Sequence, residues 1–108
     1  MNNNTEVINH LKEVLRESKI EYSRILMFGS RVRNDFEEDS DWDFLIIMKS
    51  PLNLKLKKEL WLKVYKKFHE RVPFGSIDLI LKDMESFEEE KTIANTISNE
   101  AYLEGIEV

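Results

Sequence analysis

The pair Gly29-Ser30, followed after a gap of ten residues by Asp41-Trp42-Asp43, constrains this chain more than any other feature. The apolar run 24–28 ends at the glycine, and a short apolar run closed by a turn residue is typical of a buried strand. Glycine allows a ligand to approach the main chain closely. If a helical turn begins near the serine, its free N–H groups and dipole would favour a phosphate. We therefore expect a phosphate to bind at Gly29 and Ser30.

Two arginines follow this turn, Arg31 and Arg33. A guanidinium group forms charge-assisted hydrogen bonds with phosphate oxygens. Both arginines are therefore candidate phosphate ligands, together with Gly29 and Ser30.

The run 41–48 is rich in aromatic and branched residues and predicts a second strand. Side chains at i and i+2 of a strand share one face, which places the Cα atoms of Asp41 and Asp43 about 7 Å apart. Two carboxylates at this spacing can reach a pair of Mg²⁺ ions about 3.5–4 Å apart. Hard oxygen ligands suit Mg²⁺ or Mn²⁺. Trp42 is expected to point the other way, into the core.

A third acid, Asp78, stands in the apolar run 77–81, which predicts another strand. A carboxylate in such a strand is costly unless it is paired or binds a metal. Three converging acids without a cation would also raise one another's pKa. Asp41, Asp43 and Asp78 are therefore the predicted metal ligands and catalytic residues.

This pattern, Gly29-Ser30, then Asp41-x-Asp43, then Asp78 on a later strand, resembles the nucleotidyltransferase superfamily that includes DNA polymerase β. The short chain and the string Gly-Ser-Arg-x-Arg resemble more closely the minimal nucleotidyltransferases, the antitoxins of two-gene modules whose toxins are HEPN-domain ribonucleases. The resemblance covers the chain from about residue 20 to its end. One departure is that the family pattern has a glycine soon after the second arginine, whereas Asn34-Asp35 follows Arg33 in this sequence.

The resemblance implies a division of roles among these residues. Gly29 and Ser30 would hold the triphosphate of ATP, while Asp41 and Asp43 would ligate Mg²⁺. Asp78 would ligate the catalytic metal and help to take a proton from the acceptor hydroxyl. The acceptor implied by the family is a tyrosine of the HEPN toxin, which AMP would inactivate.

Composition limits the classes of protein that the chain can belong to. We expect one domain, residues 1–108. A formal net charge of −5 gives no sign of general affinity for nucleic acid. Cysteine is absent from the sequence, which excludes disulfides and thiolate metal sites. No apolar stretch approaches the ~20 residues of a membrane span, and the polar N-terminus is unlike a signal peptide, so a cytoplasmic protein is expected.

The remaining pattern predicts an α/β (α+β) fold, in which helices pack on a small mixed sheet. Apolar residues recur at helical spacing over 7–15 and predict an amphipathic first helix. A turn of helix over 30–34, an acidic loop over 35–40 and a long helix from Pro51 to about Arg71 are expected next. A last helix is predicted from about Ser86 to Ser98, and the tail 101–108 should add an edge strand or pack on the first helix.

Two alternatives to catalysis on a toxin stay open. The chain could be a non-catalytic antitoxin that neutralises its partner by binding alone. It could also transfer a nucleotide to a small molecule such as an aminoglycoside, with a dimer forming the acceptor cleft.

Overall fold

A computed structural model describes residues 4–33 and 41–108 of the chain. The described elements, in chain order, are α1 (Asn4–Glu17), β1 (Tyr22–Phe28), β2 (Trp42–Met48), α2 (Leu54–Arg71), β3 (Ile77–Asp83), α3 (Met84–Glu90), α4 (Ile97–Glu104) and β4 (Ile106–Glu107). The predicted acidic loop 35–40, and Asn34 before it, lie outside the described residues.

The strands form one mixed sheet in the order β3-β2-β1-β4. β1 pairs antiparallel with both β2 and β4, whereas β2 and β3 run parallel. The predicted α+β class and mixed sheet are therefore confirmed. The tail adds the edge strand β4, which is the first of the two arrangements expected for it.

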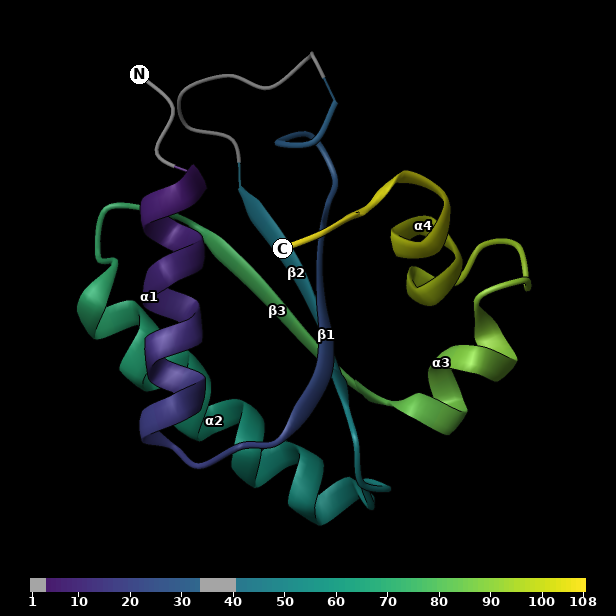
Figure 1. Ribbon diagram of the computed structural model, residues 1–108, viewed down its shortest axis with the longest axis horizontal. Coiled ribbons are helices and arrows are strands. Elements are labelled where there is room, and N and C mark those ends of the chain that lie inside the picture. The colour runs from purple at the N-terminus through teal and green to yellow at the C-terminus, as the bar shows by residue number, and fades with distance from the viewer. Residues whose placement is uncertain (1–3, 34–40) are drawn as a thin grey trace.

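The sheet is covered on both faces by helices. Buried side chains of α1 and α2 pack on one face, and α3 and α4 contribute Phe87 and Ala101 to a second cluster on the other face. Figure 1 shows the two pairs of helices on opposite sides of the strands. β2 is apolar on both faces, with Phe44 to Met48 all buried, because a central strand meets a helix layer on each side.

Two predicted helices differ from the structure. α2 begins at Leu54 rather than at Pro51, because the side chain of Asn53 accepts a hydrogen bond from the Leu56 N–H and caps the helix.

The turn predicted after Gly29 agrees with the structure over its described residues. The N–H groups of Val32 and Arg33 donate to the Gly29 carbonyl, which closes a single turn.

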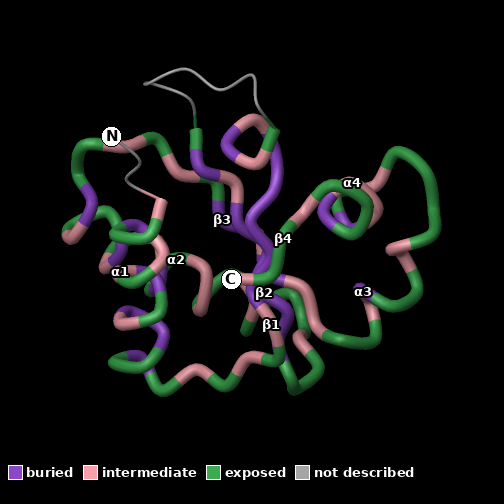
Figure 2. The backbone as a smooth tube through the Cα atoms, turned by 45° about the horizontal axis from the view of Figure 1, so that its top comes forward, coloured by how far each residue is buried: buried purple, intermediate pink, exposed green. Residues whose placement is uncertain are grey.

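The second difference is larger, because the single helix predicted over 86–98 is wrong. Asp83 caps α3 at its start, and Thr96 caps α4, so the chain forms two short helices separated by residues 91–96. Asn95 in this connection has a φ of +68°, which no α-helix can contain. The connection is largely exposed (Figure 2).

Candidate active site

Asp43 and Asp78 are register partners on the adjacent parallel strands β2 and β3. Side chains at matched positions of neighbouring strands lie on the same face of the sheet. This face is the one covered by α3 and α4, since Leu45 and Ile80, two residues further along each strand, pack in that cluster. The structure therefore brings two of the three predicted acids side by side.

Asp41 is exposed and immediately precedes β2. Its charge acts on Asp43, as does that of Asp78. Partial burial, together with these neighbouring carboxylates, raises the pKa of Asp43 from 3.8 to about 6. Asp43 thus stands at the centre of a region of negative potential, which favours binding of a cation.

Gly29 lies directly against Asp43. Its φ of +80° belongs to the left-handed region that L side chains rarely adopt. A Cβ built at this position would meet Asp43 Oδ2 at 2.0 Å. Phe28, the last residue of β1, is the register partner of Asp43, so strand pairing itself places the glycine turn beside the acid.

The turn that follows presents Ser30 and Arg33 at the same end of the sheet. Arg33 Nη1 lies 3.0 Å from Glu104 Oε2 of α4, and the positive charge of Arg33 lowers the pKa of Asp43 against the effect of the acids. Arg33 is therefore close enough to the acids to act on a ligand held there.

Arg31 is placed differently from the other predicted phosphate ligands. Its guanidinium lies 3.9 Å from the centroid of the Trp42 ring, and the residue is 7% exposed. Trp42 is buried, as predicted, on the α1 side, where its Nε1 donates to Asn4 Oδ1 at 2.9 Å. Since neighbouring side chains of a strand point to opposite faces, this stack lies away from Asp43. A phosphate contact by Arg31 stays a prediction.

One acid near the site was missed by the reasoning from sequence. Glu100 of α4 also raises the pKa of Asp43, which places its charge near the β2 carboxylate. Position 100 was expected to follow the last helix, so no pattern in the sequence linked it to the aspartates. The signal that could have found it is Thr96. Recognising this residue as a helix N-cap would have predicted a separate helix with Glu100 in its first turn.

The donor set suits a hard cation, because it offers only carboxylate oxygens. Within residues 4–33 and 41–108, however, no three His, Cys, Asp or Glu side chains already form a closed metal-ligand set. Asp43 and Asp78 share a face of the sheet, and the charges of Asp41 and Asp78 both act on Asp43. None of the described helices is long and apolar enough to cross a membrane.

The chain belongs to the nucleotidyltransferase domain family, whose model matches residues 7–104.

The chain is also similar to proteins named as adenylyltransferases. A Methanocaldococcus jannaschii protein named "Putative protein adenylyltransferase" is 29% identical over 107 residues, which cover 95% of this chain and 99% of that protein. A spectinomycin adenyltransferase from Enterococcus faecialis, solved with ATP and spectinomycin, is 26% identical with a TM-score of 0.55, covering 86% of this chain and 38% of the other. A toxin–antitoxin structure with AMP-PNP is 17% identical with a TM-score of 0.62, covering 92% and 69%, and shares the fold.

Proposed function

We propose that this nucleotidyltransferase moves AMP from ATP to a hydroxyl group of a partner protein, in a site formed by Gly29, Asp43 and Asp78 with Asp41. The observation that carries the proposal is the placement of Asp43 between Gly29 and Asp78. This puts a turn that can accept phosphate next to carboxylates that can accept metal. The full-length similarity to a relative named as a protein adenylyltransferase supports AMP as the group and protein as the acceptor.

In this proposal, Asp41, Asp43 and Asp78 would hold Mg²⁺. The bound ion would neutralise the acids and the charge of the triphosphate. Gly29 and Ser30 would donate main-chain N–H groups to phosphate oxygens, and Arg33 would exchange its contact with Glu104 for the phosphates.

The chain's residues then orient the reaction and remove the proton. The acceptor oxygen forms a bond to the α-phosphorus, the bond between the α-phosphorus and the bridging oxygen breaks, and pyrophosphate leaves. Asp78 is the exposed aspartate of β3, and it would take the proton of the acceptor hydroxyl. Alignment and fixed charges supply most of the rate gain in such transfers.

The acceptor we propose is a tyrosine of a HEPN-domain toxin encoded beside this chain, which AMP would inactivate in the cytoplasm. A structure that shares the fold is a toxin–antitoxin complex with AMP-PNP, which makes a toxin the first partner to test.

The experiment mixes the chain with ATP labelled at the α-phosphate, Mg²⁺ and the neighbouring HEPN protein. We expect label on the toxin, and none with Asp41→Asn/Asp43→Asn. Equal labelling by the double variant would overturn the catalytic proposal. If the double variant transfers no label and still protects cells fully from the toxin, the chain acts as a binding antitoxin instead.

A second candidate is transfer to a small cationic molecule. It is favoured by the 26% identity to an enzyme solved with ATP and spectinomycin, although the chain spans only 38% of that protein. Labelling of spectinomycin, together with resistance of a sensitive strain, would establish this function.

A further inference from the structure

A hollow of about 430 Å³ is lined by residues of α4 and of the segment before it. Seven residues between positions 95 and 104 line it, among them Ile97, Glu100, Leu103 and Glu104. None of these residues was predicted to take part in function.

The hollow adjoins the acids through α4. α4 covers the face of the sheet on which Asp43 lies, and Figure 1 shows it beside β1. Glu104, in the wall of the hollow, binds Arg33 of the glycine turn at 3.0 Å. Glu100 lies one helical turn before Glu104, and its charge acts on Asp43, so both glutamates of the lining are near the active site.

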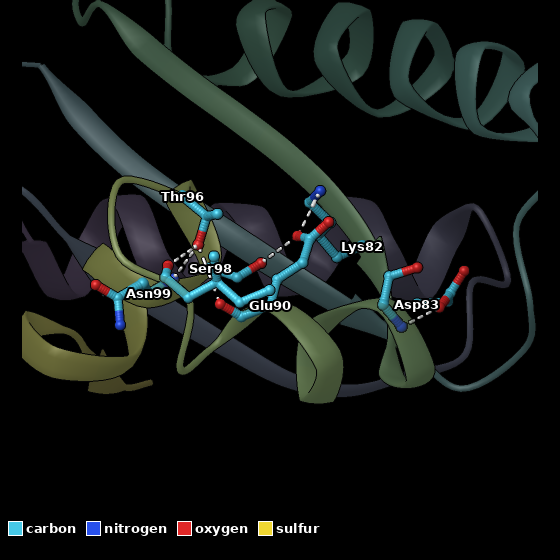
Figure 3. Close-up of polar contacts among 8 residues, drawn as sticks. Lys82, Asp83, Glu90, Thr96, Ser98 and Asn99 are labelled. Atoms are coloured by element: carbon cyan, nitrogen blue, oxygen red, sulfur yellow. Dashed lines mark hydrogen bonds and ion pairs between the residues drawn. The ribbon is translucent and has the colours of Figure 1, made fainter.

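The wall of the hollow is held by polar contacts rather than left as a loose loop (Figure 3). The Thr96 hydroxyl donates to the carbonyls of Glu90 and Ile93 and accepts from the Asn99 N–H. The Asn99 amide donates to the Lys91 carbonyl at 2.7 Å.

A second set of contacts ties α4 to the sheet through α3. Glu90 Oε1 accepts from the buried Ser98 hydroxyl at 2.9 Å and pairs with Lys82 of β3 at 2.8 Å. These contacts fix α4 relative to β3, so the hollow is present before any ligand binds.

The charge of the lining selects its occupant. The lining residues include two glutamates and no lysine or arginine, so the hollow repels the triphosphate of the donor and the backbone of a nucleic acid. Among residues 4–33 and 41–108, Glu100 forms no ion pair, which leaves its carboxylate available to a cation. Leu103 is 70% exposed and Ile97 is 42% exposed, and this apolar surface is what a protein segment can cover.

We propose that the hollow binds a basic segment of the acceptor protein, in which a lysine or arginine meets Glu100 and an apolar neighbour packs on Leu103. The proposal rests on the proposed function and names the surface by which the acceptor reaches the active site. A protein occupant is favoured over a small cation because a small cation would pair with Glu100 and leave Ile97 and Leu103 exposed, whereas a protein segment can cover them as well.

The test uses the full chain with the HEPN partner as acceptor and compares Glu100→Gln and Leu103→Ser with wild type. Each substitution should raise the KM for the acceptor about tenfold or more, since central interface side chains contribute on this scale. In Leu103→Ser, which removes no charge from the neighbourhood of Asp43, the rise in melting temperature caused by ATP with Mg²⁺ should stay as in wild type. Glu89→Gln and Leu62→Ser, at exposed positions of α3 and α2, serve as matched controls.

An unchanged KM for both hollow variants overturns the proposal. Loss of labelling in Asp43→Asn shows separately that the proposed reaction occurs. Binding of the partner without ATP is also measured, so that the surface is tested even where no label is transferred. If Glu100→Gln and Leu103→Ser both leave the Kd for the partner unchanged, the hollow is not the binding surface. The same conclusion follows if Glu100→Gln lowers transfer to spectinomycin and leaves transfer to the protein unchanged.

Discussion

The carboxylate of Asp43 fills the space in which a side chain at Gly29 would lie. The distance from Asp43 Oδ2 to an added Cβ would be 2.0 Å, far inside van der Waals contact. The backbone at this position also has a φ of +80°. The glycine is therefore required twice, once by its own conformation and once by the acid on the neighbouring strand.

We expect Gly29→Ala to displace Asp43 and to strain the turn. Folding stability should fall by about 1–3 kcal/mol, the usual cost of a residue forced into a sparsely populated backbone region. Transfer activity should fall far more, by about 100-fold, because small displacements of catalytic groups have effects of this size. Urea unfolding and label transfer measure the two effects. Ser23→Ala, an exposed position of β1, should change neither.

The pH dependence of stability should report Asp43. Its pKa is raised from 3.8 to about 6, mainly by burial and by Asp78, so the folded state binds the proton more tightly than the unfolded state. The stabilisation is fully present below about pH 4 and is lost as the pH rises through about 6. Without metal, Asp43→Asn should therefore be more stable than wild type at pH 7.5, by about 1 kcal/mol after screening by water.

This difference should shrink at pH 4, where the wild-type carboxyl is protonated and resembles the amide. Urea unfolding of both proteins at the two pH values gives the comparison. An Asp43→Asn variant that is less stable than wild type at pH 7.5 would contradict the arrangement of like charges around this residue.

Arg31 should contribute to stability through its stack on Trp42. Arg31→Lys keeps the charge but loses the planar contact, and we expect a loss of about 1 kcal/mol. A phosphate contact by Arg31 stays a prediction, so the affinity for ATP with Mg²⁺ is measured on the same variant. A loss of nucleotide affinity of about tenfold or more would support that contact, and a change of less than about threefold would leave the stack on Trp42 as the role of Arg31.

Much of the fold could be predicted because β1, β2 and β3 are short apolar runs with clear ends, and α1 has regular apolar spacing. The pairing of Asp43 with Asp78 follows from the same patterns, because each acid stands near the start of its strand. The break at 91–96 was not predicted because the glutamates of α3 favour a continuous helix. The residues that indicate two helices are single capping residues, Asp83 and Thr96.

The position of Glu100 could not be predicted for a related reason. Its approach to Asp43 depends on how α4 packs against β1. Gly105, which ends α4, lies against β1, where an added Cβ would meet the Met27 carbonyl oxygen at 3.3 Å. Local sequence patterns carry no record of such a contact.

Asp83 provides a test of the capping assignment itself. Its carboxylate accepts from the N–H groups of Ser86 and Leu52, which lowers its pKa. Asp83→Ala should cost about 1–2 kcal/mol, and Asp83→Asn less, because an amide keeps one acceptor. The stabilisation is present above pH 3.8 and is lost as the pH falls through the lowered pKa. Thermal unfolding of the three proteins at pH 7 and pH 3 checks both the size and the direction.

The central claim is that Asp43 and its neighbours bind ATP together with Mg²⁺. Calorimetric titration of the chain with ATP, with and without Mg²⁺, tests it most directly, and Asp83→Asn is the matched carboxylate control. We expect wild type and the control to bind ATP only when Mg²⁺ is present. The affinity of Asp43→Asn for ATP with Mg²⁺ should be lower by at least about tenfold. Equal affinity in wild type and Asp43→Asn, or binding that is indifferent to Mg²⁺, would contradict the account.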